Sequence, residues 1–105
     1  MTSDISDDKI AVENGNHPGY VHMVNARKYT AMRTTLLALL PSAAPGLTQK
    51  EMMDAAKQTA DYQVFPNGEK TGWWVKIVQL DLEAKGIVTR VPGKPLRWHL
   101  SRPKD

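Results

Sequence analysis

The chain of 105 residues contains no cysteine, which excludes disulfides, iron–sulfur clusters and thiolate zinc sites. It also lacks a long hydrophobic run. The longest uninterrupted one is residues 36–40, whereas a membrane-spanning helix needs roughly 20 apolar residues. The first residues lack the basic and then apolar pattern of a secretory signal. From these absences we expect a soluble, cytoplasmic protein without a membrane partner.

Motifs for catalysis and cofactor binding are missing as well. The three histidines do not have the spacing, with one another or with acidic residues, that a metal site needs. The Gly-Glu-Lys-Thr segment resembles part of a phosphate-binding loop, but Glu69 and Val64 stand where that motif requires glycine. No Gly-x-Ser-x-Gly nucleophile elbow is present. We therefore expect no metal, no cofactor and no enzymatic activity.

Charge is distributed unevenly along a chain whose length corresponds to one domain. Residues 1–13 hold one basic and four acidic side chains, a net charge of −3. The whole chain has 14 basic and 11 acidic side chains, so residues 14–105 hold thirteen basic and seven acidic ones, a net charge of +6. We predict an acidic disordered tail over residues 1–13 and a single domain over residues 14–105. A basic domain favours partners that carry phosphates, because neutralised phosphates release condensed counterions.

Hydrophobic spacing and capping residues predict two helices in the first half of the domain. Asn25 is a good N-cap for a helix over residues 26–40, which carries a broad apolar stripe. Thr48 and Glu51 form the capping-box pattern, in which each side chain accepts a hydrogen bond from the backbone of the other. This pattern predicts that a second helix begins after Thr48 and extends to about Thr59.

The second half of the domain predicts a third helix and a hairpin. The helix covers residues 70–85, and Gly86 follows where a left-handed cap is favoured. Residues 87–91 and 96–100 read as two antiparallel strands, and the second alternates apolar and polar side chains. A further short strand is expected at residues 20–24. The predicted fold is mainly α (α+β), a winged helix-turn-helix with three helices followed by a C-terminal β-hairpin wing.

Several segments resemble a family of small uncharacterised bacterial proteins, and the most specific of them contains Gly72-Trp73-Trp74. The segments that carry the likeness are residues 14–19, 28–29, 31–32, 72–76, 78–86 and 95–99. The family is a domain of unknown function grouped with winged-helix folds. The resemblance therefore implies the architecture, and it implies no activity, cofactor or catalytic residue.

The winged-helix prediction leads to a DNA-binding hypothesis. The third helix would enter the major groove, and basic side chains of the hairpin would hold phosphates. Gln79 is suited to pair with adenine, and Lys76 to reach guanine or a phosphate. We predict a DNA-binding protein of the kind found among transcriptional regulators. The predicted contacts with duplex DNA are Lys70, Thr71, Lys76 and Gln79 of the third helix and Arg90, Lys94 and Arg97 of the hairpin.

Two features favour the alternative, a protein–protein interaction module without DNA binding. Residues 60–69 form a longer link between helices than the three or four residues of a standard helix-turn-helix. Asp81 and Glu83 also dilute the positive charge of the third helix. Neighbouring helix positions lie about 100° apart, so we expect one of two adjacent tryptophans to be buried and the other partly covered. Either function is compatible with a monomer or with a weak homodimer through residues 20–24. The candidate partner-binding residues are Trp73, Trp74, Tyr62 and Phe65.

Overall fold

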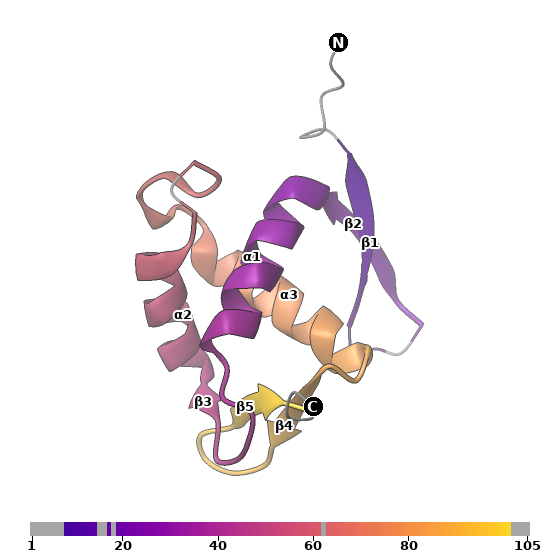
Figure 1. Ribbon diagram of the computed structural model, residues 1–105. Helices are drawn as coiled ribbons and strands as arrows, with labels where there is room; N and C mark the ends of the chain where they lie inside the picture. The colour runs from indigo at the N-terminus through magenta and orange to yellow at the C-terminus, as the bar shows by residue number, and fades with distance from the viewer. Residues whose placement is uncertain (1–7, 15–16, 18, 62, 102–105) are drawn as a thin grey trace.

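Three helices lie between two small antiparallel sheets in the computed structural model, which describes residues 8–14, 17, 19–61 and 63–101 (Figure 1). This architecture confirms the predicted α+β class. It differs from the expected order in two respects, because a hairpin precedes the first helix and a short strand lies between the first and second helices. In chain order the elements are β1 (Lys9–Glu13), β2 (Val21–Asn25), α1 (Ala26–Leu39), β3 (Leu47–Thr48), α2 (Gln49–Thr59), the 3-10 helix η2 (Pro66–Gly68), α3 (Thr71–Ala84), β4 (Val88–Val91) and β5 (Arg97–Leu100).

The two sheets lie against different parts of the helical layer (Figure 1). Strands β1 and β2 pair with each other and pack on α1 and α3. The second sheet has the order β3-β5-β4, with β5 in the middle. Leu47 of β3 lies opposite Trp98 of β5, and Arg90 of β4 lies opposite the same tryptophan. The predicted C-terminal hairpin is therefore confirmed and gains a third strand.

The helix starts agree with the capping residues identified in the sequence. The Asn25 side chain accepts a hydrogen bond from the backbone N–H of Lys28 at 2.9 Å. Helix α1 begins at Ala26, directly after this cap. The Thr48 hydroxyl accepts from the backbone N–H of Glu51 at 3.1 Å, and the Glu51 carboxylate accepts from the backbone N–H of Thr48 at 2.9 Å. Both halves of the capping box are therefore formed. Gly86 has a φ of +76°, the left-handed conformation expected after α3.

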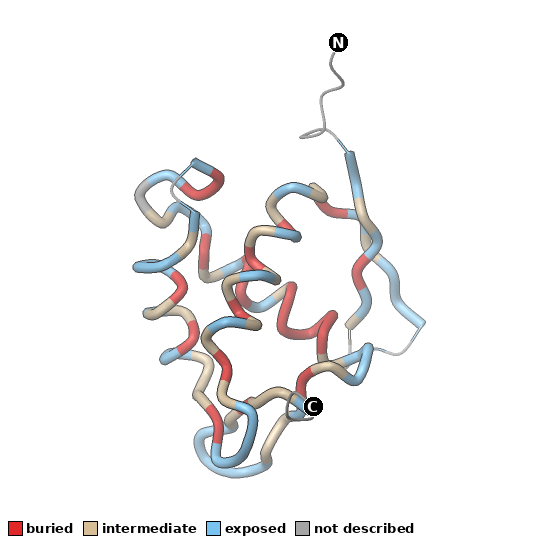
Figure 2. The backbone as a smooth tube through the Cα atoms, in the orientation of Figure 1, coloured by how far each residue is buried: buried red, intermediate tan, exposed pale blue. Residues whose placement is uncertain are grey.

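The hydrophobic core lies where the three helices meet, and Figure 2 shows buried positions on their inward faces. Trp98 of β5 is buried as well, so the hairpin packs on the helices through this ring. Packing of this kind stabilises a hairpin that would be marginal alone. The fully buried core side chains of the helices include Met32 and Leu36 of α1, Met52 of α2 and Val75, Val78 and Leu82 of α3.

Residues 9–13 require a correction, because the sequence analysis placed them in the acidic tail and they form β1. Ile10 and Val12 alternate with polar residues, and Val12 is buried in the core. Val12 also lies opposite His22 of β2, so the segment is held both by backbone pairing with β2 and by burial of Val12 in the core. The strand expected at residues 20–24 is present one residue later. Residues 1–7 of the predicted tail lie outside the described residues.

Asp81 fixes the β1–β2 hairpin to the helices from a fully buried position in α3. Its carboxylate accepts a hydrogen bond from the backbone N–H of Glu13 at 2.8 Å, and others from the Tyr29 hydroxyl and the Lys85 ammonium. Burial raises the pKa of Tyr29 above its ordinary value, and the hydrogen bond to Asp81 raises it further. Three elements, β1, α1 and α3, therefore meet at one carboxylate. The prediction that Asp81 dilutes the surface charge of α3 is therefore wrong, because its carboxylate is buried.

Candidate functional site

Two of the predicted DNA-contacting side chains of α3 are buried, which corrects their assignment. Thr71 and Gln79 are each 3% exposed. The Thr71 hydroxyl donates to the carbonyl oxygen of Gly68 at 3.0 Å, and the Gln79 side chain accepts from the Gln49 amide at 3.2 Å. Gln49 belongs to α2, so this helix packs against α3 at Gln79. Neither side chain is available to a base edge in this structure.

Three predicted contacts are exposed lysines. Lys76 lies on the solvent face of α3, and Lys94 lies in the turn between β4 and β5. Lys70 precedes α3 with a φ of 60°, a left-handed conformation, and makes no side-chain cap. Within the described part of the chain, none of the three forms an ion pair. Their ammonium groups are therefore available to phosphate oxygens.

Arg90 is occupied within the fold. Its Nε atom lies 3.1 Å from a carboxylate oxygen of Glu83, and its guanidinium lies over the Trp98 ring, 5.8 Å from the ring centroid. The Trp98 indole N–H donates to the same Glu83 carboxylate at 3.2 Å. Glu83 therefore ties β4 and β5 to α3. Glu83 helps to pack the β4–β5 hairpin, and it partly neutralises the positive charge of Arg90.

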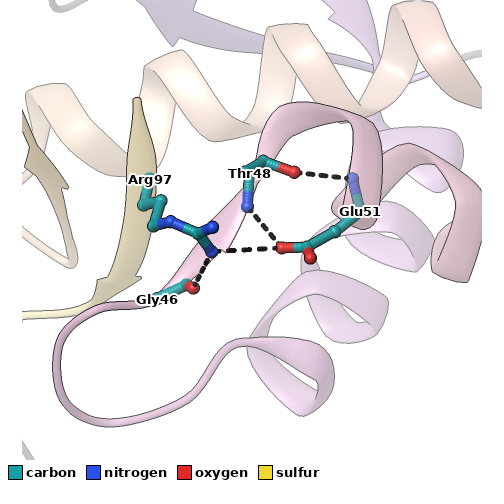
Figure 3. A network of polar contacts seen from close by, with 4 residues as sticks. All are labelled: Gly46, Thr48, Glu51 and Arg97. Atoms are coloured by element: carbon teal, nitrogen blue, oxygen red, sulfur yellow. Dashed lines mark hydrogen bonds and ion pairs between the residues drawn. The ribbon is translucent and has the colours of Figure 1, made fainter. Parts of the chain in front are cut away.

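Arg97 of β5 is held in a second network, which includes Gly46, Thr48 and Glu51 (Figure 3). Its guanidinium donates to the carbonyl oxygen of Gly46 at 3.1 Å and lies 3.5 Å from the Glu51 carboxylate. The backbone hydrogen bond from Thr48 holds the pKa of Glu51 below its ordinary value, and the positive charge of Arg97 lowers it further. Arg97 thus connects β5 to the capping box of α2, although its side chain keeps partial contact with solvent.

The aromatic candidates lie at the amino-terminal end of α3. As expected for adjacent helix positions, Trp74 is buried whereas Trp73 is 49% exposed. The two rings meet edge to face with centroids 5.0 Å apart, an arrangement that fixes the exposed ring. Phe65 is buried against Trp74, and Tyr62 lies outside the described residues.

An open groove of about 530 Å³ runs beside Trp73. Two lysines, Lys28 of α1 and Lys70, line it together with Trp73 and Trp74. The Lys28 ammonium also lies over the Phe65 ring, 5.7 Å from its centroid. Lys28 was not among the residues predicted for either site. Its position in the first turn of α1 gave no sign of Phe65 or Trp73, which are distant in sequence.

The described residues contain no group of three or more histidine, aspartate or glutamate side chains placed to hold a metal ion. Within the same residues, no helix is both long enough and apolar enough to span a bilayer. Among the predicted DNA contacts, Lys70, Lys76 and Lys94 remain exposed, and other exposed features include the groove at Trp73 and the outer side of the β1–β2 hairpin.

The fold and these surfaces define a small α+β domain with a basic, aromatic groove at the start of its third helix. The sequence profile of DUF6958, a family of unknown function, matches residues 9–98, and the chain belongs to this family. The match confirms the resemblance to an uncharacterised domain. No curated protein matches the chain, and no solved structure matches it.

Proposed function

We propose that residues 26–100 form a winged-helix domain that binds duplex DNA. The order of elements supports this proposal, since α1, β3, α2 and α3 are followed by the β4–β5 hairpin. Helices α2 and α3 would form the helix-turn-helix unit, and β4–β5 would form the wing. The β1–β2 hairpin is then an addition in front of the domain.

The observation that carries the proposal concerns three of the seven predicted contacts, Lys70, Lys76 and Lys94, which are exposed and form no ion pair with a described residue. They lie at the start of α3, on its solvent face and in the turn of the wing, which are the parts of a winged helix that approach DNA. Arg90 and Arg97 contribute mainly to the fold, because each is held by a glutamate.

The proposed binding does not depend on base sequence. Gln79 was the side chain best suited to read a base, and it is buried against Gln49. Lysines hold phosphates as point charges and position a protein without reading the sequence. We therefore expect affinity for duplexes of mixed sequence, with a strong dependence on salt.

Fluorescence anisotropy of a labelled mixed-sequence duplex at several salt concentrations tests this proposal. Three neutralised phosphates predict a slope of about −2.7 in a plot of log affinity against log salt for one chain, from about −0.9 per contact. A triple variant with Lys70, Lys76 and Lys94 changed to Ala should lose most of the affinity and of the slope. Its control changes Lys9, Arg27 and Lys57, also exposed, to Ala and removes the same charge elsewhere.

Equal loss of affinity in the two triple variants would show that net charge alone attracts DNA and would refute the assigned surface. Absence of binding by the unmodified protein at low salt would refute the DNA function itself.

A second candidate function is a protein-interaction module, and the groove at Trp73 favours it. A half-exposed indole between Lys28 and Lys70 suits a peptide that carries an apolar side chain beside an acidic one. Titration with acidic peptides that contain one leucine or phenylalanine, followed by tryptophan fluorescence, tests this function. Binding that is lost on Trp73→Ala, with unchanged affinity for DNA, would support it, and an unaffected titration would oppose it.

A further inference from the structure

The β1–β2 hairpin has one strand edge whose hydrogen-bonding groups point outward. The backbone N–H of Ala26 donates to the carbonyl oxygen of Asp8 at 2.8 Å, so these two residues form a hydrogen-bonded pair of the ladder. Hydrogen-bonded and non-hydrogen-bonded pairs alternate along an antiparallel ladder. Val21 and Met23 therefore belong to non-hydrogen-bonded pairs. Their N–H and C=O groups point away from β1, toward the outer edge of β2.

The two outer edges of the hairpin differ. On the β1 side, the backbone N–H of Glu13 donates to the buried carboxylate of Asp81, so α3 closes that edge at one end. On the β2 side, Val21 and Met23 make no backbone hydrogen bond to any described residue. The outer edge of β2 is therefore open at Val21 and Met23, whereas the outer edge of β1 is engaged at Glu13.

Strand β2 lacks the features that usually protect an edge strand. Its sequence, Val-His-Met-Val-Asn, contains no charged residue and no proline, and its register with β1 has no bulge. The side chains on its outer face are apolar and exposed, since Val21 is 55% and Met23 is 57% exposed. Ala11 of β1 lies opposite Met23 on the same face, and Tyr20 at the start of the strand is exposed too. An uncharged edge with this composition is suited to pair with another strand.

We propose that β2 pairs antiparallel with β2 of a second copy of this chain, about a two-fold axis beside Met23. The two hairpins then form one four-stranded sheet in the order β1-β2-β2-β1. Met23 faces Met23 of the second copy as a hydrogen-bonded pair, and Val21 faces Asn25. This register uses the outward-pointing groups of Val21 and Met23 in both copies, and neither residue makes a backbone hydrogen bond to a described residue in the single chain. The proposal does not depend on DNA binding.

Charge and symmetry favour a second copy in this orientation. Lys9 and Glu13 lie at opposite ends of the outer face of β1, and both are exposed. In the antiparallel arrangement, a row of four side chains across the sheet runs from Lys9 and Asn25 of one copy to Val21 and Glu13 of the other. Each such row therefore has opposite charges at its two ends. A parallel arrangement would place like charges in the same row. The two-fold contact also closes on itself, because it uses both β2 edges and leaves none for a third chain.

Sedimentation of the full chain over a range of concentrations, without DNA, tests the proposal. We expect a species of twice the 11.7 kDa of one chain. Met23→Pro removes the N–H that points to the outer edge. The pairing of β2 with β1 loses no hydrogen bond, because the Met23 N–H does not donate to β1. This variant should sediment as a monomer at concentrations where the unmodified protein is dimeric.

A pair of lysine substitutions keeps the test decisive if proline disturbs the hairpin. Met23→Lys places a charge at the proposed contact, and Ala11→Lys places the same charge on the same face of the neighbouring strand. Met23→Lys should dissociate the dimer and Ala11→Lys should leave it intact, with tryptophan fluorescence confirming that both are folded. A monomeric unmodified protein, or equal dissociation by the two lysines, would overturn the edge-to-edge dimer.

Discussion

Removal of the Asp81 carboxylate should destabilise the protein strongly, because three donors converge on it. In Asp81→Ala, the Tyr29 hydroxyl loses its acceptor in a buried site, and an unsatisfied buried donor costs about 1–3 kcal/mol. The backbone N–H of Glu13 lies closer to solvent and should contribute about 1 kcal/mol. Lys85 regains water and adds little. The expected loss is about 2–4 kcal/mol, which overlaps the range of about 3–5 kcal/mol for breaking a buried ion pair.

Urea denaturation followed by tryptophan fluorescence measures this loss as a lower midpoint at an unchanged slope. A loss of about 2–4 kcal/mol is a large fraction of the roughly 5–15 kcal/mol that stabilises a typical domain. Asp54→Ala is the matched control, since Asp54 also pairs with a lysine four residues away, but on the surface of α2. Water screens that pair, so its midpoint should change little. If the two variants lose equal stability, Asp81 does not fix the hairpin as we argue.

Two further predictions concern a glycine and a tyrosine. Gly46 has a φ of +86°, and a Cβ atom there would lie 2.3 Å from the Trp98 carbonyl oxygen. Gly46→Ala should therefore lower the melting temperature more than Gly86→Ala. Gly86 has a similar φ but no atom within 4 Å of an added Cβ, so its substitution should cost only about 1 kcal/mol. Equal effects of the two substitutions would contradict the close approach at Gly46. The pKa of Tyr29 is raised by burial, so the folded protein keeps a proton that the unfolded chain loses above about pH 10. Stability should be complete below that pH and fall as the pH rises further, and urea midpoints should show a weaker fall in Tyr29→Phe.

The parts of the fold that sequence predicted depend on local interactions. Asn25 and the Thr48 capping box act within one helical turn, so their residue types alone indicate where α1 and α2 begin. Strand β3 was missed because it has two residues and forms only through pairing with β5, at Trp98 and Arg97. Strand β1 was missed because the acidic composition of residues 1–13 outweighed a short alternation of Ile10 and Val12. Pairing between distant segments leaves little trace in either segment by itself.

The candidate site shows the same division between local and distant information. Helical spacing correctly predicted that Trp73 and Trp74 point in different directions, because that follows from the geometry of one helix. It placed Gln79 on the side of the helix that faces DNA and could not show that Gln49 of α2 packs against it. A buried polar residue has the same composition signal as an exposed one, and only its partner distinguishes them. For Gln79 that partner is Gln49, in another helix.

The two proposals together make a joint prediction about salt dependence. The positive charge available to DNA is smaller than the sequence suggests, since Arg90 and Arg97 are held by glutamates. A dimer through β2 doubles the positive charge available to DNA, because the dimer has two sets of the three lysines. If both sets contact one duplex, the log–log slope should approach −5.4, from about −0.9 for each of six phosphates. Met23→Pro should then return the slope to about −2.7 without removing any positive charge. An unchanged slope in this variant would mean that the two domains of the dimer do not contact the same duplex.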